Sequence, residues 1–565
     1  MSSTGHTPPP PAPRRKPGTL LLAILPLALY LAHIALYVQY VNDDAYITFR
    51  YSRFLATGRG PYFNVGEHVE GYTNFLHMLV MSLVYAIGGV SAVPIVAKIL
   101  GIVSGGAALA LIQTLTRRLA GTSRRLASHA SLAGSLAGGL VAVTPGYALN
   151  CASGLETGPL ALWVTLAVYL GIRAEVDGRW RGAGIAWALA VLTRPEAVAV
   201  FGVWAVGYTL AALATAAPES DASRWTVALI RPIARDVAIT AAVVTVHFVF
   251  RWLAYDGELL PNTWFAKSGG YLGYTPWEYV RRGALAPVLG LAGLLAGLVG
   301  WALAGLRPRF AWPAAAVAIF GAFMPLLVGA DWMPGWRFSA PYLPMLASGV
   351  ALGWILLMTP LTARDRALAP IAVVVAVGLA AVLHHPERVE LAEMVVLRAD
   401  GYATGHRALA EWIAETTGPD ATVALMDIGI VGYYCDEARI LDISGLTDRH
   451  IAKSPGPLLA KQYDPAYILD REPEIIVLVI SAWGDSREPL PEGREIGTWI
   501  PIEGSIFAHP QFQAHYRRPP TDAAATDWTS EIAERIGAER VFEHAHPDQY
   551  YLLAAFRRLP VALNP

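Results

Sequence analysis

Long apolar stretches with almost no charged side chains recur through the first 385 residues of the chain. The first, Thr19–Tyr40, has about the 20 residues that a helix needs to cross a hydrocarbon core of about 30 Å. It has no A-x-A cleavage site, so we expect an uncleaved membrane helix. The chain is therefore predicted to be mainly α, a polytopic transmembrane helical bundle. Further apolar segments lie near residues 126–147, 157–172, 182–194, 196–214, 237–254, 284–304, 311–328, 339–359 and 368–383.

The composition supports this class and excludes others. Apolar residues make up 54% of the chain and charged residues only 15%, against roughly 25% charged in a soluble domain. The formal net charge is −1, so no global basic field indicates a nucleic-acid partner. The two cysteines, Cys151 and Cys435, provide neither a disulfide framework nor a metal-ligand spacing.

Basic clusters in short connections predict the side of the membrane on which each connection lies. The positive-inside rule places these clusters in the cytoplasm, together with a disordered N-terminus over residues 1–18. The intervening connections, including a first loop over residues 41–74, then lie outside a plasma (inner) membrane. Phe75–Thr116 contains two apolar runs for one net crossing, so one run is expected to lie in the interface or to re-enter, and we expect about 11–13 helices in all. The basic clusters are Arg14–Lys16, Arg117–Arg125, Arg173–Arg181, Arg231–Arg235, Arg307–Arg309 and Arg364–Arg366.

After His384 the chain becomes charged and mixed, with no run long enough to span a membrane. Three short apolar pieces, Thr422–Met426, Arg439–Ile443 and Ile475–Ile480, are bounded by turn and helix signals and predict strands. We therefore expect a soluble α/β domain over residues 386–565, long enough for its own core. The charge pattern places this domain outside the cytoplasm, next to a transmembrane domain over residues 19–385.

Acidic side chains are concentrated at the start of the first outer loop. Asp43 and Asp44 follow the first helix directly, and carboxylates beside hydrocarbon are costly unless they are solvated, paired or used. One of them could be a general base, or they could cap the helical stretch Ala45–Leu55. The remainder of the loop suits a polyhydroxylated or phosphorylated ligand through Glu67, Glu70, Tyr72 and Asn74.

Cations mark three later outer connections. Arg194 and Glu196 interrupt an otherwise uncharged stretch of about 33 residues. Arg194 could close a hairpin through an ion pair with Glu196, or could hold a lipid phosphate by charge-assisted hydrogen bonds. The next connection carries Asn262 and Lys267 behind a proline turn. The last contains Asp331, Trp332 and Arg337, which could also form an interfacial belt.

The order of these motifs resembles a known family. Asp43–Tyr51 is followed by Gly58-Arg59-Gly60 and Val69–Asn74, and then by Gly154–Thr157, Leu192–Glu196, Leu260–Thr263, Gly329–Pro334 and Asp427–Asp442. This ordered set covers nearly the whole chain. It is similar to GT-C fold glycosyltransferases that use polyprenyl-phosphate sugars, nearest to the bacterial terminal arabinofuranosyltransferase-like membrane family. The chain departs from the family at His77, where an aromatic residue is common.

The resemblance implies a GT-C catalytic domain that moves a hexosyl or pentosyl group from a polyprenyl-phosphate donor to an extracytoplasmic glycan, lipid or protein acceptor. Asp44 or Asp43 would be the base, and Arg194, Lys267 and Arg337 would stabilise the leaving phosphate. Glu156 and Asp331 would orient hydroxyl groups. No cofactor is implied, and a divalent metal stays open. Other substrate contacts would come from Glu67, Glu70, Tyr72, Asn74, Asn262 and Trp332.

Two other classes of protein share parts of this pattern. A transporter or flippase of a lipid-linked sugar would place coupling charges near the bilayer midplane, often with internal repeats. Here the predicted helices are nearly free of charge and no repeat is evident. A membrane scaffold with an outer binding domain would explain the C-terminal part but not the charged first loop. The sequence therefore favours a transferase, with the sugar and the acceptor left open.

Overall fold

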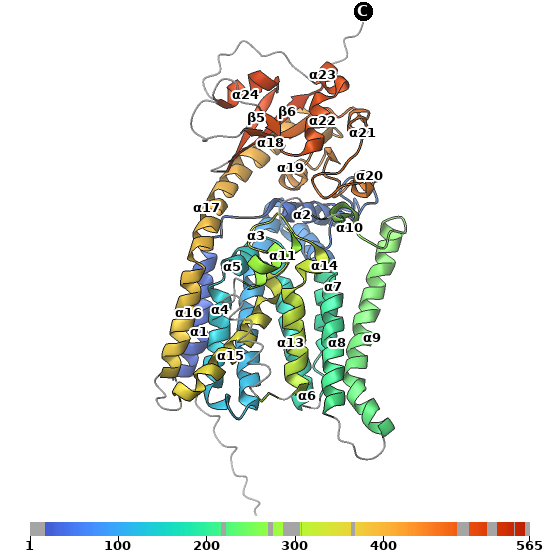
Figure 1. Ribbon diagram of the computed structural model, residues 1–565. Coiled ribbons are helices and arrows are strands. Elements are labelled where there is room, and N and C mark those ends of the chain that lie inside the picture. The colour runs from blue at the N-terminus through green and yellow to red at the C-terminus, as the bar shows by residue number, and fades with distance from the viewer. Residues whose placement is uncertain are drawn as a thin grey trace, which may run out of the picture.

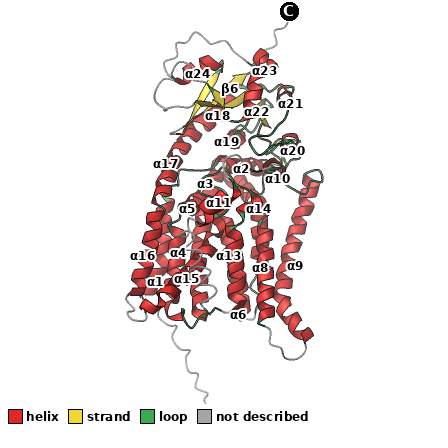
Figure 2. Ribbon diagram, viewed as in Figure 1, coloured by secondary structure: helices red, strands yellow, loops and turns green. Residues whose placement is uncertain are grey.

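A bundle of long helices carries a small α/β domain at one end (Figure 1). Every strand among the described residues lies in that domain (Figure 2). The predicted fold class is therefore confirmed, while the predicted disordered N-terminus lies almost entirely outside the described residues. The computed structural model describes residues 17–177, 179–215, 222–268, 270, 275–285, 305–306, 308–362, 368–482, 496–516, 528–546 and 549–559.

Helices form at each apolar segment that the sequence indicates within the described residues. Five are long and apolar enough to cross a membrane, or seven if two bent pairs each form one span, and three shorter helices are also apolar. The predicted total of about 11–13 includes residues 284–304, most of which lie outside the described residues, so it stays a prediction. The bundle helices are α1 (Pro17–Ile34), α3 (Phe75–Thr122), α4 (Ala130–Ala142), α5 (Pro145–Ala152), α6 (Thr157–Asp177), α7 (Ala183–Thr193), α8 (Ala197–Ala214), α9 (Ala222–Ala254), α13 (Pro308–Ala322), α15 (Leu343–Thr362) and α16 (Leu368–Leu383).

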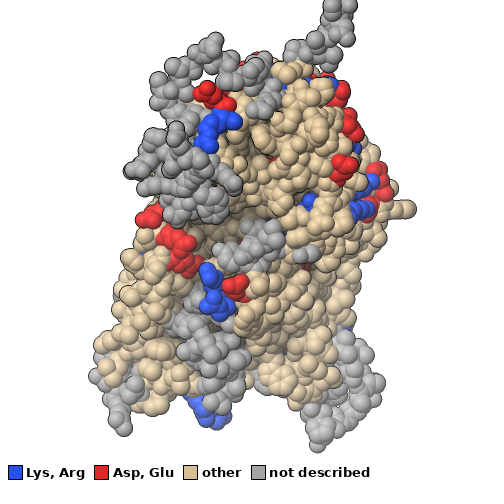
Figure 3. Space-filling model, turned by 45° about the horizontal axis from the view of Figure 1, so that its top comes forward, with Lys and Arg blue, Asp and Glu red and all other residues tan. Residues whose placement is uncertain are grey.

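The flank of the bundle is apolar. Large apolar side chains such as Leu83, Val246 and Leu253 are more than half exposed, which is costly in water but favourable against lipid tails. On the face shown in Figure 3, charged side chains are few on this flank and gather on the C-terminal domain and near its junction with the bundle. The exposed apolar side chains therefore indicate that the flank of the bundle faces lipid, and the charged side chains indicate that the C-terminal domain faces water.

Helix α3 is broken near its start. Gly89 has a φ of 71°, which removes it from helical geometry. The arm before the break runs along α2 (Asp43–Ala56): Ser52 Oγ donates to the Met78 carbonyl at 2.9 Å, and the Arg53 guanidinium lies over the Tyr85 ring. This arm thus lies beside α2 at the domain end of the bundle, and it corresponds to the first of the two predicted apolar runs in Phe75–Thr116.

Helix α2 lies between the bundle and the C-terminal domain (Figure 1). Its N-cap is Asn42, whose side chain accepts from the Asp44 N–H at 2.9 Å, so neither aspartate caps the helix itself. Further along α2, the buried Arg50 guanidinium donates to the carbonyls of Cys435 (3.1 Å) and Ala438 (2.8 Å). These contacts hold α2, which lies in the predicted first outer loop, between the helical bundle and the C-terminal domain.

The C-terminal domain contains a mixed sheet in the order β2-β1-β3-β6-β5, with β4 (Gly497–Thr498) paired to β3. The three predicted strands are confirmed as β1 (Thr422–Leu425), β2 (Arg439–Asp442) and β3 (Ile475–Ala482). They pair in parallel, whereas β5 (Arg540–His546) and β6 (Gln549–Arg557) form an antiparallel hairpin that joins β3. Helices α17 (His385–Gly401) and α18 (Ala408–Thr416) connect the bundle to this sheet.

Candidate active site

A cavity of about 670 Å³ opens where the bundle meets the C-terminal domain. It collects polar side chains that are distant in sequence, and one end is apolar. The polar lining includes Asp44, Thr48, Tyr72, Asn74, Glu156, Arg194, Lys267 and Arg337. The apolar lining includes Val198 of α8, Val244 and Phe248 of α9, and Leu326 and Leu327 of α14 (Pro325–Val328). A polar head and an apolar tail of one ligand could therefore both be accommodated.

Asp44 lies in the first turn of α2 and lines this cavity. Its carboxylate makes no hydrogen bond or ion pair with any residue that the structure describes. Burial raises the pKa of Asp44 to about 7, against the opposing charges of Lys267 and Arg337. A carboxylate with a pKa near neutrality and a free face is suited to accept a proton.

Asp43 points away from the cavity, toward the C-terminal domain. Its two carboxylate oxygens accept from the backbone N–H groups of Ile430 (2.7 Å) and Gly429 (3.2 Å), at the start of α19 (Ile428–Tyr434). Gly429 permits this approach, because a Cβ there would collide with the Asp43 backbone carbonyl. Asp43 therefore fastens the domain to α2.

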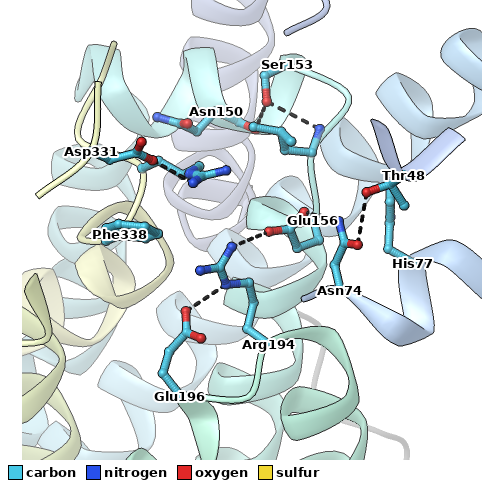
Figure 4. A network of polar contacts seen from close by, with 12 residues as sticks. Thr48, Asn74, His77, Asn150, Ser153, Glu156, Arg194, Glu196, Asp331 and Phe338 are labelled. Atoms are coloured by element: carbon cyan, nitrogen blue, oxygen red, sulfur yellow. Dashed lines mark hydrogen bonds and ion pairs between the residues drawn. The ribbon is translucent and has the colours of Figure 1, made fainter. Parts of the chain in front are cut away.

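A polar network joins several side chains of the cavity wall (Figure 4). Arg194 lies between two carboxylates, at 2.8 Å from Glu156 and 2.7 Å from Glu196. Asn74 donates to the second oxygen of Glu156 at 2.7 Å and accepts from Thr48 at 3.0 Å. Burial alone would raise the pKa of Glu156, but the nearby Arg194 and Arg337 outweigh it and lower the pKa to about 2. The network thus holds Arg194 in place, and its second terminal nitrogen, Nη2, has no partner among the described residues.

The turn before Glu156 requires glycine. Gly154 has a φ of 80°, and a Cβ there would meet the Val41 side chain at 2.9 Å. This turn leads the chain from α5 into α6 and delivers Glu156 to the cavity, with the buried His77 ring near the Gly154 carbonyl at 3.2 Å. His77, where the resemblance predicts an aromatic residue, therefore contacts the turn that carries Glu156.

Two further cations reach the cavity from other connections. Arg337 pairs with the buried Asp331 at 2.6 Å and lies over the Phe338 ring, which also underlies Arg194. Lys267, at the end of α10 (Asn262–Lys267), forms no hydrogen bond or ion pair within the described part of the chain. Burial lowers the pKa of Lys267, while Asp331 opposes this shift. The site thus combines anchored guanidinium groups with one ammonium group free to meet an anion.

Five predicted substrate contacts do not line the cavity, and one of them is Asp331, which is buried and pairs with Arg337. Glu67 forms an exposed ion pair with Arg439 at 2.6 Å. Glu70 pairs with Arg251 at 2.8 Å just behind the wall, and burial raises its pKa to about 7. Asn262 ties α10 to the C-terminal domain, donating to the carbonyls of Gly445 and Leu446 at 3.0 Å. Trp332 lies under the Arg398 guanidinium instead.

Two charged or titratable residues that α9 contributes to the cavity wall are not among the predicted site residues. Arg251 and His247 lie one turn apart on α9 and both line the cavity. Both lie within the apolar segment near residues 237–254, where the sequence predicts a membrane helix. The signal that could have identified them is their i, i+4 spacing at the domain end of an otherwise apolar helix.

The described residues contain no group of three or more His, Cys, Asp or Glu side chains placed to hold a metal ion. Glu156 at the cavity is paired with Arg194, and the buried Asp331 is paired with Arg337, whereas Asp44 has no such pair among these residues.

Comparisons with known proteins agree with this geometry. A family described as a domain of unknown function, DUF8728, matches residues 394–550. The terminal beta-(1->2)-arabinofuranosyltransferase of Corynebacterium glutamicum is 27% identical over 308 residues, which are 49% of this chain and 41% of that relative. The matched part spans about two fifths of the relative's length.

Two solved structures share the overall fold. ArnT from Cupriavidus metallidurans bound to undecaprenyl phosphate has a TM-score of 0.53 at 15% identity, covering 95% of this chain and 98% of that chain. AglB, the oligosaccharyltransferase from Archaeoglobus fulgidus, in complex with an inhibitory peptide and a dolichol-phosphate, has a TM-score of 0.56 at 11% identity, covering 96% and 88%. The predicted resemblance is confirmed, and the chain is a multi-pass membrane protein with a GT-C type fold.

Proposed function

We propose that the chain is a membrane glycosyltransferase that moves a sugar from a polyprenyl-phosphate donor to a glycan, lipid or protein acceptor. The observation that carries the proposal is the cavity itself. The carboxylate of Asp44 and the ammonium group of Lys267, neither paired within the described residues, line it together with the anchored Arg194 and Arg337. A base and a set of cations around one space are what this transfer requires.

In the proposed reaction, the acceptor hydroxyl attacks the anomeric carbon of the donor sugar. A new carbon–oxygen bond forms as the bond between that carbon and the phosphate oxygen breaks, and the electron pair leaves with the phosphate. Asp44 takes the hydroxyl proton, which its pKa of about 7 permits at neutral pH. Lys267, Arg337 and Arg194 stabilise the negative charge that develops on the phosphate.

The two ends of the cavity fit the two parts of such a donor. The phosphate would lie near Lys267, and the polyprenyl chain would leave between α9 and α14 along Val244, Phe248 and Leu327. Apolar side chains next to the lipid phase suit a chain that remains partly in the membrane. The bound undecaprenyl phosphate named for ArnT and the dolichol-phosphate named for AglB support this donor class.

The acceptor would enter from the side of the C-terminal domain. Leu446 of that domain contributes to the cavity lining, and Asn262 joins the domain to the cavity wall. Together with the positive-inside pattern, this arrangement supports a cytoplasmic N-terminus and an extracytoplasmic domain in the plasma (inner) membrane. The relative named as an arabinofuranosyltransferase supports a pentosyl donor as the first to be tried.

The decisive experiment incubates the purified full-length protein with a panel of radiolabelled polyprenyl-phosphate pentoses and hexoses. We expect release of the free polyprenyl phosphate with one donor, in step with labelling of an added glycan, and no release with Asp44→Asn. Parallel reactions with and without a chelator measure metal dependence. If proteoliposomes move the intact lipid-linked sugar across the membrane without releasing the carrier, the chain is a flippase and the proposal is overturned.

A further inference from the structure

A second cavity, of about 450 Å³, lies between α6, α8 and α9. Its lining comes from the last turns of α6, from Trp204 and Tyr208 of α8, and from Arg231–Asp236 at the start of the apolar span of α9. These helix ends are at the end of the bundle opposite the C-terminal domain (Figure 1). The proposed transfer reaction makes no use of this cavity.

Three arginines line the cavity, Arg179 from the connection after α6 and Arg231 and Arg235 from α9. Arg231 and Arg235 are four residues apart and therefore lie on one face of the helix. All three side chains are exposed. Arg179 and Arg231 form no ion pair or hydrogen bond within the described residues, so their guanidinium groups are available to a ligand.

The acids of the cavity are already engaged. Glu175 accepts from Arg309 at 2.8 Å and from the Tyr208 hydroxyl at 2.6 Å. Asp236 accepts from the Trp180 indole N–H and from the Gly184 backbone N–H, each at 2.8 Å. Arg309 neutralises Glu175, whereas the partners of Asp236 are uncharged, so its carboxylate offsets the charge of the nearby Arg235. Arg179 and Arg231 then leave the described part of the cavity with a net positive charge.

The surroundings place this charge at a membrane surface. Trp180 is 38% exposed and lies under the Arg235 guanidinium, and an exposed indole is typical of the membrane–water interface. Directly beyond the cavity, α9 turns its side chains outward, since only 11% of its apolar window is buried. An anion in the cavity would thus adjoin a helix surface suited to acyl chains.

We propose that this cavity binds the phosphate-bearing headgroup of an anionic phospholipid from the leaflet opposite the C-terminal domain. Arg179 and Arg231 donate to the phosphate oxygens, a geometry that guanidinium groups favour. The acyl chains lie along the exposed side of α9. Basic pockets between membrane helices recognise lipid headgroups through these same interactions.

The test compares lipids on the full-length protein purified in detergent, with native mass spectrometry as the measurement. Phosphatidylglycerol is compared with phosphatidylcholine of the same acyl chains, and glycerol 3-phosphate serves as the soluble phosphate. We expect one retained phosphatidylglycerol, little retained phosphatidylcholine, and no displacement by glycerol 3-phosphate at matched concentration. Equal retention of both lipids, or displacement by glycerol 3-phosphate, would contradict a specific lipid site.

Substitutions of the cavity arginines test whether the lipid binds at this cavity. Arg179→Gln with Arg231→Gln should reduce phosphatidylglycerol retention by about tenfold or more, since each basic side chain near an anionic headgroup contributes about fivefold. Arg124→Gln with Arg125→Gln, two exposed arginines in the connection after α3, is the matched control and should retain the lipid. If both pairs reduce retention equally, general surface charge explains the binding and the assignment fails. Arg179→Lys with Arg231→Lys keeps the charge and should retain an intermediate amount, which decides the matter if the glutamine pair folds poorly.

Discussion

The two sides of the first turn of α2 differ in how their carboxylates are used. On the side facing the C-terminal domain, both oxygens of Asp43 are satisfied by backbone N–H groups of α19. On the side facing the cavity, Asp44 has no partner among the described residues. Adjacent residues of one helix point in different directions. Asp43 therefore binds the C-terminal domain, while the carboxylate of Asp44 faces the cavity without a partner among the described residues.

The cations of the cavity can be divided in the same way, into those that have a carboxylate partner among the described residues and one that has none. Arg194 is held by Glu156 and Glu196, and Arg337 is held by Asp331. Lys267 has no such partner within the described residues. A partly buried charge without a partner is costly for the folded state, so we infer that the partner of Lys267 is the donor phosphate of the proposed reaction. The comparison therefore separates groups that build the site from groups that act in it, and each can be tested.

The largest effect is expected for Asp44→Asn. The amide keeps the size of the side chain but cannot take a proton, so turnover should fall by about 10²–10⁴-fold while donor binding stays within a few-fold. Turnover is measured as release of labelled polyprenyl phosphate, and binding by equilibrium retention of the donor. Near-normal turnover would mean that Asp44 is not the base, and Glu156 or Asp331 would be examined next.

Lys267→Met should produce the next largest effect. The substitution keeps an unbranched side chain but removes the charge nearest to the proposed phosphate, and loss of one such group typically lowers turnover by about 10²–10³-fold. The matched control is Lys453→Met, which removes an exposed lysine paired with Glu258 at 2.6 Å. If both lysine variants behave alike, Lys267 has no special role in the transfer.

The pH dependence should follow Asp44. A base with a pKa of about 7 is active only when deprotonated, so kcat/KM should fall as the pH drops through 7. Two units below the pKa, at about pH 5, the loss should be about a hundredfold. Asp44→Asn should flatten this acid limb. A limb that persists in Asp44→Asn would assign the titration to another group, such as Glu70 with its pKa of about 7.

Arg194→Lys should have a smaller effect. Lysine keeps the positive charge but cannot contact Glu156, Glu196 and a phosphate oxygen at once, because it lacks the planar fork of arginine. We expect donor affinity to fall by about tenfold, the loss of one charged hydrogen bond of about 1.5 kcal/mol. Normal donor affinity with a lower thermal midpoint would show that Arg194 only closes the hairpin.

The helices and the first three strands could be predicted because their signals are local. Uncharged segments of membrane length, and apolar runs such as Ile475–Ala482, specify an element without reference to the remainder of the chain. The hairpin of β5 and β6 was not predicted. Its register is set by pairing with β3, for example Leu478 with Ala554, which a local pattern does not reveal.

For the site, the sequence indicated the acids and cations but not their partners. Nothing near Asp43 in the sequence shows that it binds Ile430, because their contact depends on how the C-terminal domain docks. The pairing of Glu70 with Arg251 was missed for the same reason, since Arg251 ends an apolar helix. Which of two adjacent carboxylates is free is thus decided by tertiary contacts, and only the structure distinguishes them.

The smallest effect on catalysis is expected for Asp43→Asn. The amide oxygen can still accept from Ile430, but the amide nitrogen then faces the Gly429 N–H, which loses its acceptor. An unsatisfied buried donor costs about 1–3 kcal/mol, so the thermal midpoint should fall by several degrees, at about 2–4 °C per kcal/mol, while turnover stays within about threefold. Gly429→Ala disturbs the same contact from the opposite side, because its Cβ would meet the Asp43 carbonyl, and it should lower the midpoint in the same way.

The control is Asp436→Asn, which removes a separate contact between α2 and the domain at Arg53. It shows how much any loss of contact between α2 and the C-terminal domain affects turnover. If Asp43→Asn instead abolishes turnover at a normal midpoint, the roles of the two aspartates are reversed.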